Sequence, residues 1–422
     1  MMKSFKNKYI VGIIILILGI ITYKLCNRSE TYGHKVVICI PVYGQSLALG
    51  EEAVRITNFD SLRLKFDGRI VNENLDYQFG CYNDKKWKRI FKRLFQDHRR
   101  SFELSLYSMA ESLATELGND TIICIFPGGL GETPIYKFTK EYDYIYPIFI
   151  SDIKNAFEKS KERGWEFYVP AICWMQGESD IVDYPETDYK KTLEAIGQDL
   201  NTDIKAITNQ KEDVRFICYQ ANPLSLAKSF DKNQFNCVET RVCQAYVDLI
   251  RDNSLFWASG PTYPYHCVND YLHIDAAGQQ HIGLLEADAV LRILRNEQKT
   301  FGVIPISLTT EGNDVIVSLN VPQPPLVFDT TSVKHIDNYG FSVITKNGRN
   351  ILDKAYIEDS SVRLTCTESP LECKVRYAVN GEKKKSGNTY GPRGNLRDSH
   401  PLRNWCYQFD IQSTWPPSQH RR

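Results

Sequence analysis

Three short segments, far apart in the 422-residue chain, carry side chains that together could perform acyl transfer. The first ends at Ser46, the second contains Gln176, and the third runs from Asp270 to His273. A serine hydroxyl becomes a useful nucleophile when a base lies within hydrogen-bonding reach, and an imidazole base needs a carboxylate that fixes its tautomer. Each segment is weak evidence alone, so the interpretation depends on their order and on the predicted elements around them.

Acyl transfer also needs hydrogen-bond donors that point at the oxyanion formed on the substrate. The backbone N–H of Ser46 is one candidate, because it lies at a turn after an apolar strand-like stretch. The glycine-rich stretch at residues 128–131 is a second, since a backbone without side chains can approach a substrate closely. The carboxamide of Gln176 is a third. The alternatives are purely structural roles: a plain turn for residues 128–131 and helix N-capping for Asp270.

The elements that must position these residues follow from the apolar periodicity of residues 34–296, where strand-length apolar stretches alternate with segments of helical period. This alternation predicts an α/β fold of three layers, with a doubly wound, flavodoxin-like parallel sheet of five strands. The predicted strands are 35–40, 121–126, 167–174, 214–219 and 255–258, and the predicted helices are 102–117, 146–163, 189–208, 235–252 and 276–296. Ligands of such sheets bind beyond the carboxyl ends of the strands, which is where Ser46, Gly131, Gln176 and His273 fall.

The chain divides into three predicted regions. Residues 1–30 resemble a signal peptide or signal anchor, because lysines precede an apolar stretch at residues 9–23 that is shorter than a typical membrane-spanning helix. Residues 31–298 form the α/β domain, with an insertion at about 51–100, and residues 299–422 form a smaller β-rich domain. The first region predicts an exported protein, anchored in a membrane or located in the periplasm or cell envelope.

The charge pattern limits the choice of partners. Basic and acidic residues balance at 51 each, so the net charge gives no general attraction to nucleic acid. Within the insertion, residues 85–95 have the pattern of a basic amphipathic helix. Its apolar face would pack on the sheet, or the helix would contact an anionic bilayer or an acidic polysaccharide.

The twelve cysteines show no spacing typical of a zinc site. Most are predicted to be unpaired, and those in strand-like stretches are expected to pack in the core as small apolar side chains. Cys366 and Cys373 flank a short turn, and either a disulfide across this turn or two free thiols fits the sequence.

The three segments resemble those of the GDSL-like, or SGNH, hydrolases, in particular the carbohydrate acetylesterase branch with sialate O-acetylesterases and plant-type acetylxylan esterases. That branch carries Gly-Gln-Ser at the nucleophile, Trp-x-Gln-Gly-Glu where the wider superfamily has Gly-x-Asn-Asp, and a final Asp-x-x-His. The matching segments in this chain are Gly44-Gln45-Ser46, Trp174-Met175-Gln176-Gly177-Glu178 and Asp270-Tyr271-Leu272-His273.

The resemblance implies Ser46 as nucleophile, His273 as base and Asp270 as the carboxylate that orients the base. The implied oxyanion hole consists of the N–H groups of Ser46 and Gly131 with the carboxamide of Gln176. The choice between Gly131 and Gly129 stays open, because a glutamate replaces the second glycine of the family's Gly-Gly-Thr-Ser-Ile.

Two further residues are expected to support this site. Glu178 matches the family's glutamate and is expected either to hold the site loops or to have a purely structural role. Gln45 is expected to pack or hydrogen bond beneath the nucleophile turn. Tyr263, Tyr265 and Tyr271, near the base, could stack on a sugar ring or form the wall of the site.

The resemblance implies a serine esterase that removes O-acetyl groups from a carbohydrate through an acyl-serine intermediate, with no metal or cofactor. One alternative is an envelope-anchored O-acyltransferase that uses the same three residues. Another is a glycan-binding surface protein whose hydrolase domain has lost its activity.

Overall fold

The computed structural model of the chain describes residues 35–76, 102–268, 272–299 and 302–414. The N-terminal apolar segment, the basic helix predicted in the insertion, Asp270 and Tyr271 lie outside these ranges.

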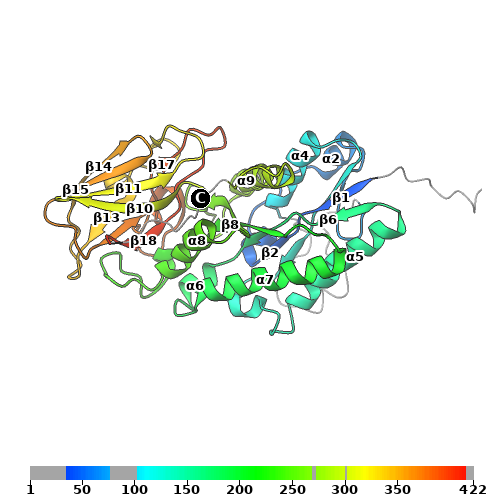
Figure 1. Ribbon diagram of the computed structural model, residues 1–422, viewed down its shortest axis with the longest axis horizontal. Helices are drawn as coiled ribbons and strands as arrows, with labels where there is room; N and C mark the ends of the chain where they lie inside the picture. The colour runs from blue at the N-terminus through cyan, green and yellow to red at the C-terminus, as the bar shows by residue number, and fades with distance from the viewer. Residues whose placement is uncertain (1–34, 77–101, 269–271, 300–301, 415–422) are drawn as a thin grey trace, which may run out of the picture.

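A parallel sheet forms the centre of the larger domain and confirms the predicted fold class (Figure 1). Three of its chain segments each contain two consecutive strands, so the sheet has two parts, ordered β3-β4-β1-β6 and β5-β2-β7-β8-β9. The chain therefore crosses the sheet in the doubly wound manner that was predicted. The strands are β1 (Val36–Cys39), β2 (Val42–Gly44), β3 (Ile70–Val71), β4 (Thr121–Cys124), β5 (Pro127–Gly129), β6 (Glu166–Tyr168), β7 (Ala171–Met175), β8 (Arg215–Gln220) and β9 (Phe256–Pro261).

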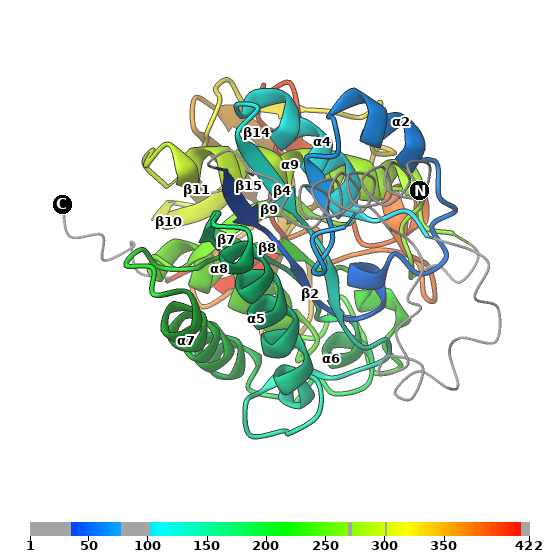
Figure 2. The ribbon, with the colours of Figure 1, turned by 90° about the vertical axis from the view of Figure 1, so that its right-hand side faces the viewer.

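Helices cover both faces of this sheet, as Figure 2 shows with α4 and α9 above it and α5 and α7 below. The inner strands are buried and apolar because helices cover them on both sides. The long helices are α4 (Ser105–Glu116), α5 (Tyr146–Glu162), α7 (Tyr189–Thr208), α8 (Thr240–Asp252) and α9 (Ala276–Leu294). Shorter helical turns are η1 (Ser46–Leu49), η2 (Ile135–Phe138), α6 (Glu178–Val182) and η3 (Leu224–Leu226).

One predicted helix starts later than expected. The sequence predicts a helix from residue 235, but α8 begins at Thr240. The backbone carbonyls of Gln234 and Phe235 accept hydrogen bonds at 2.8 and 2.9 Å from the buried guanidinium of Arg376 in the C-terminal domain. A contact between the two domains therefore holds this segment in a non-helical conformation.

The described part of the insertion adds elements that the sequence did not suggest. It contains α2 (Phe59–Lys65) and β3, which joins the edge of the sheet by pairing Ile70 with Ile123 of β4. Its return to the domain is anchored by the buried Glu103 carboxylate, which accepts hydrogen bonds from the N–H groups of Ile56 and Thr57 at 2.8 and 2.9 Å.

The C-terminal region is built from antiparallel sheets, as predicted (Figure 1). One sheet has the order β10-β11-β15-β14 and another the order β13-β16-β18. The elements are β10 (Ile304–Glu311), β11 (Asp314–Asn320), β12 (Val327–Phe328), η4 (Asp337–Gly340), β13 (Phe341–Ile344), β14 (Leu352–Glu358), β15 (Ser361–Cys366), β16 (Lys374–Tyr377), α10 (Gly387–Tyr390), β17 (Leu396–Arg397) and β18 (Phe409–Gln412). Cys366 and Cys373 are both free, so the disulfide alternative does not apply.

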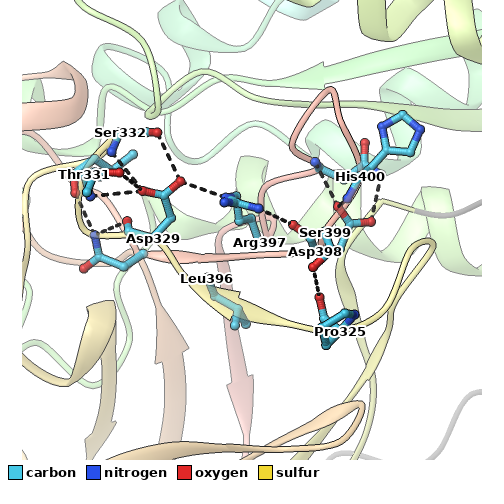
Figure 3. Close-up of polar contacts among 12 residues, drawn as sticks. Pro325, Asp329, Thr331, Ser332, Leu396, Arg397, Asp398, Ser399 and His400 are labelled. Carbon is cyan, nitrogen blue, oxygen red and sulfur yellow. Dashed lines mark hydrogen bonds and ion pairs between the residues drawn. The ribbon is translucent and has the colours of Figure 1, made fainter.

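A turn around Asp329 follows β12 and contacts β17, the strand that pairs with β12 (Figure 3). Its carboxylate accepts hydrogen bonds from the N–H groups of Thr331 and Ser332 at 3.0 and 2.9 Å and from Arg397 Nε at 2.8 Å. Burial opposes the charged form, but the bonds from Ser332 and Arg397 outweigh it and lower the pKa of Asp329. These hydrogen bonds satisfy the charged carboxylate of Asp329 inside the protein. We therefore assign it a structural role.

The α/β region and the C-terminal β-rich region share a buried polar junction. Gln220, at the end of β8, donates to the carbonyl of Gln408 at 2.9 Å and accepts from its N–H at 2.7 Å. The Tyr407 hydroxyl donates to the Cys218 carbonyl at 3.0 Å and accepts from the N–H of Gly260 at 2.7 Å. Trp405 and Tyr407 are buried and belong to the core.

Within the described residues, no helix has the length and apolar character needed to cross a membrane.

Candidate active site

The nucleophile candidate lies at a tight turn after β2. Ser46 is the first residue of η1, and both it and Gln45 are buried. Gly50 ends this helical turn in a left-handed conformation, and the next N–H, of Glu51, donates to the Ser46 carbonyl at 3.1 Å. This bond holds Glu51 directly beside the turn that carries Ser46.

Strand pairing brings the first two sequence segments and the glycine-rich loop together. In the parallel register, Gly44 lies opposite Gly129 of β5 on one side and Met175 of β7 on the other. A Cβ atom at Gly44 would lie 1.9 Å from the Met175 carbonyl oxygen, and one at Gly129, whose φ is 138°, would lie 1.7 Å from the Gly44 carbonyl oxygen. Glycine is therefore required at both positions by close backbone approach. Ser46 and Gln176 follow these paired residues, so both lie beyond the carboxyl ends of neighbouring strands.

Gln176 is fully buried and links three parts of the site. Its Nε2 lies 3.2 Å from Gln45 Oε1, 3.1 Å from the Thr133 carbonyl and 2.6 Å from Asp180 Oδ2. Its Oε1 accepts a hydrogen bond from the Tyr189 hydroxyl at 2.7 Å. Two amide hydrogens thus face three acceptors within the protein. A bond to a substrate oxyanion would have to replace one of them, so the predicted donor role of Gln176 stays a prediction.

Two buried tyrosines provide further hydrogen-bond partners for residues 174–176. The hydroxyl of Tyr246 donates to the Gln176 backbone carbonyl and lies 2.6 Å from the Tyr189 hydroxyl. Trp174 Nε1 donates to the Tyr246 hydroxyl at 3.1 Å and lies 3.3 Å from that of Tyr189. These partners hold the end of β7 in place. They also satisfy the indole N–H of Trp174, which is fully buried.

Two buried carboxyl groups lie on α6, the short helix that follows Gln176. Burial raises the pKa of Glu178 to about 7, against a hydrogen bond from the Tyr219 hydroxyl and the nearby imidazole of His273. Burial likewise raises the pKa of Asp180 to about 6, against hydrogen bonds from Gln176 and from the N–H of Ile135. Glu178 is therefore close enough to His273 to respond to its charge.

The base candidate is held in a short hairpin-like loop after β9. The His273 carbonyl accepts from the N–H of Val268 at 2.8 Å, and Cys267 pairs with Ile274 in an antiparallel bridge. Asp270 lies within this loop, outside the described residues. The N-cap of α9 is Asp275, which accepts from the N–H of Gly278 at 2.8 Å. The bland alternative, in which Asp270 caps this helix, is therefore wrong.

Glu51 connects the base to the other loops. Its Oε2 lies 3.8 Å from Nε2 of the buried His273. Its Oε1 lies 2.8 Å from the place that a Cβ of Gly131 would occupy. The loops of Ser46, Gly131 and His273 therefore converge on this one carboxylate. Gly129 is instead paired within β5, which favours Gly131 as the loop glycine at the site.

The residues predicted to support the site make the following contacts. Gln45 Oε1 accepts from Gln176 and from the N–H of Ser179 at 3.4 Å, beneath the nucleophile turn. Tyr263 and Tyr265 are buried, and their hydroxyls bond to the Cys406 carbonyl at 2.8 Å and to His281 at 2.9 Å. These two tyrosines form the wall rather than a stacking surface.

Sequence reasoning missed Glu51, Asp180, Tyr189 and Tyr246 as members of the site. Asp180 and Tyr189 lie just after the Trp-x-Gln-Gly-Glu segment, so nearness in sequence was a usable signal. Tyr246 enters from α8 and gave no such signal. Among the described residues, no cluster of histidine, cysteine, aspartate and glutamate side chains has an arrangement suited to a metal ion.

Comparison with solved structures finds one carbohydrate acetylesterase with a similar fold and several weaker likenesses. A carbohydrate acetylesterase from Xanthomonas citri superposes with a TM-score of 0.60 at 13% sequence identity, over 90% of this chain and 81% of that chain. NanS superposes with a TM-score of 0.43 at 14% identity, over 63% of this chain and 99% of that chain. A protein from Arabidopsis thaliana gives 0.42 at 14% identity, over 61% and 98%. At these identities, the first likeness shows the fold alone.

The family comparison is made on sequence. Curated proteins gave no match. The family model described as carbohydrate esterase, sialic acid-specific acetylesterase, matches residues 82–292, which is half of the chain. The match contains Gln176 and His273 and begins after Ser46. Membership implies an ester hydrolase, and the chain belongs to this family of carbohydrate esterases.

Proposed function

We propose that this protein is a serine esterase that releases acetate from an O-acetylated carbohydrate. The observation that carries the proposal is the convergence of three loops at the carboxyl ends of the strands. The pairing of Gly44 with Gly129 and Met175 aligns two of them, and Glu51 lies beside Ser46, Gly131 and His273. The family supports an acetyl ester of a sugar as the substrate class.

In the proposed mechanism, Ser46 Oγ attacks the acetyl carbonyl carbon while His273 takes the hydroxyl proton. The carbonyl π electrons move to oxygen, and the N–H groups of Ser46 and Gly131 stabilise this oxyanion, with Gln176 as a third donor if it exchanges one of its present acceptors. The C–O bond to the sugar then breaks as His273 returns the proton to the leaving hydroxyl. Water attacks the acyl-serine with His273 as base, and acetate and free Ser46 result. Asp270 orients the imidazole throughout.

Replacement of the nucleophile tests this proposal. Ser46→Ala should lower acetate release from 4-nitrophenyl acetate and from acetylated sugars at least about a thousandfold, with an unchanged melting temperature. Ser254→Ala is a matched control, because this serine is exposed before β9, at the opposite end of the strands. Full activity in Ser46→Ala would overturn the mechanism. His273→Ala should also be inactive, and the wild-type rate should fall at acidic pH as the imidazole becomes protonated.

We also propose that the chain is exported and held at the cell envelope by residues 9–23, on the strength of the lysine-rich start and the apolar stretch that follows. Fractionation of the full chain against a chain that begins at Ser29 tests this. Recovery of the full chain in the cytoplasmic fraction would contradict it.

A further inference from the structure

A group of exposed tyrosines lies on the loops that form the site. Tyr136, Tyr142 and Tyr184 expose 43%, 40% and 44% of their surface. The Tyr136 ring contacts both others edge to face, with ring centres 6.1 Å from Tyr142 and 6.5 Å from Tyr184. Lys137 places its Nζ 5.8 Å and 6.0 Å from the ring centres of Tyr136 and Tyr142. Large aromatic side chains gathered in this way on a surface indicate a binding function. We call these three residues the tyrosine platform.

The backbone around Tyr136 continues directly from the catalytic loops. It lies in η2, one residue after Ile135, whose N–H donates to Asp180 Oδ2 at 2.9 Å. The same Asp180 oxygen accepts from Gln176, which also donates to the Thr133 carbonyl. The platform is therefore rigidly attached to the loop that follows Gly131.

The second attachment is through α6. Tyr184 follows this helix, and its N–H donates to the carbonyl of Ser179 at 3.2 Å. The N–H of Ser179 faces Gln45 Oε1 at 3.4 Å, next to the nucleophile. One loop of the site thus contributes Tyr136 and Tyr142, another contributes Tyr184, and the rings meet edge to face. By contrast, the tyrosines near the base, Tyr263 and Tyr265, are buried and cannot take this role.

We propose that the tyrosine platform is a carbohydrate subsite, on which sugar rings next to the acetylated residue stack. The inference rests on the proposed function and extends it: the substrate is an oligosaccharide or polysaccharide chain rather than a free acetylated monosaccharide. The C–H face of a pyranose is apolar and its edge carries hydroxyls, which matches an aromatic ring with a hydroxyl at its tip. Lys137 adds a donor beside two of the rings. Continuity with the catalytic loops is what selects a carbohydrate chain over other partners for an exposed aromatic surface.

Hydrolysis rates on matched substrates test the proposal. The substrates are O-acetylated xylo-, manno- and gluco-oligosaccharides, the corresponding acetylated monosaccharides, and 4-nitrophenyl acetate. For the wild-type protein, kcat/KM should be at least about tenfold higher on one class of oligosaccharide than on its monosaccharide. Tyr136→Ala and Tyr184→Ala should each reduce that preference about fivefold, and the double variant should abolish it. Activity on 4-nitrophenyl acetate, which has no sugar ring to stack, should fall much less than activity on the oligosaccharide in each of them.

Two controls separate stacking from folding. Tyr136→Phe keeps the ring and should keep most of the preference. Tyr356→Ala removes an equally exposed tyrosine, 41% exposed on β14 of the C-terminal domain, and should have no effect. A wild-type protein without oligosaccharide preference, or a double variant that keeps it, would overturn the platform.

A binding measurement distinguishes this failure from failure of the proposed function. Calorimetric titration of the Ser46→Ala protein with the non-acetylated oligosaccharides should detect binding that the added Tyr136→Ala and Tyr184→Ala changes abolish. Binding to none of them, or equal binding with and without the two tyrosines, would also overturn the platform. Absence of acetate release from every ester by the wild-type protein would refute the esterase proposal instead, whatever the titration shows.

Discussion

Two buried glutamines organise two different regions of this molecule. Gln176 joins the loops of the candidate site, and Gln220 joins the α/β domain to the C-terminal domain. Both are fully buried, and both bond through the side-chain amide to segments distant in sequence. Their partners differ in kind. Gln220 exchanges hydrogen bonds with the backbone of Gln408, whereas Gln176 shares its amide with the carboxyl of Asp180.

This difference separates a structural junction from a site for chemistry. At the junction between the two regions, neutral backbone groups satisfy the glutamine, so none of its hydrogen-bond partners titrates. In the candidate site, the side-chain amide of Gln176 lies among Glu178, Asp180 and His273. Burial raises the pKa of the two carboxyls toward neutrality. Ionisable groups gathered in this way are typical of functional sites.

After loss of the nucleophile or the base, the largest loss of activity is expected where backbone approach allows no side chain. In Gly44→Ala the added Cβ would lie 1.9 Å from the Met175 carbonyl oxygen, so β2 and β7 must separate and the site loops must move with them. We expect a loss of esterase activity of more than about a hundredfold and a destabilisation of about 1–3 kcal/mol. Acetate release and thermal unfolding measure the two effects.

The control for this change is Gly118→Ala, because no described atom lies within 4 Å of the Cβ position at Gly118. It should leave both measurements near the wild-type values. Near-normal activity of Gly44→Ala would mean that strand pairing does not set the geometry of the site.

The two glutamines provide the direct test of the comparison. Gln176→Ala and Gln220→Ala each leave buried polar partners without a hydrogen bond, so both should lose about 2–4 kcal/mol of unfolding free energy. Only Gln176→Ala should also lower kcat/KM on 4-nitrophenyl acetate, by about a hundredfold, at a temperature where both proteins are folded. Chemical denaturation and steady-state kinetics on the same preparations provide these values. A comparable loss of activity in Gln220→Ala would contradict the division into two roles.

A third buried carboxyl tests whether a raised pKa alone marks the chemistry. Burial raises the pKa of Glu286, on α9, from an ordinary 4.5 to about 8, against the nearby side chains of Ser105 and Cys173. Its stabilising contribution is complete below pH 4.5, declines as the pH rises, and is lost above pH 8. Glu286→Gln, neutral at every pH, should flatten the decline in melting temperature across this range by a few degrees.

The activity of Glu286→Gln should remain within about threefold of wild type, because this residue lies away from the loops of the site. Glu162→Gln, at the exposed end of α5, should reproduce the wild-type pH dependence of stability. An unchanged pH dependence in Glu286→Gln would show that the buried carboxyl is not the titrating group.

A shift of the rate–pH profile is expected at Glu51. Its carboxylate lies 3.8 Å from His273 Nε2, so Glu51→Gln removes a negative charge that favours the protonated imidazole. The acid limb of the rate–pH profile should therefore move to lower pH by several tenths of a unit, with a change in the maximal rate of less than about tenfold. An unmoved acid limb would mean that this carboxylate does not act on the base.

The sequence by itself determined the parallel α/β fold, and it placed Ser46 and Gln176 just after two strands and His273 in the loop after the last strand of the sheet. It did so because apolar periodicity and strand-end position depend on nearby residues in the chain. The later start of α8 was not visible, because Arg376 of the other domain holds the segment before it. The extra strand β3 was likewise missed, since two residues carry too little pattern.

Only the tertiary structure decided which groups meet. The placement of Glu51 beside His273, the bonds of the Gln176 amide to Gln45 and Thr133, and the meeting of Tyr136 with Tyr184 all join residues that are distant in sequence. The physical reason is that strand register and loop closure, rather than local composition, bring such side chains within a few ångströms. Residue type therefore marked the candidates for chemistry, and packing determined their neighbours.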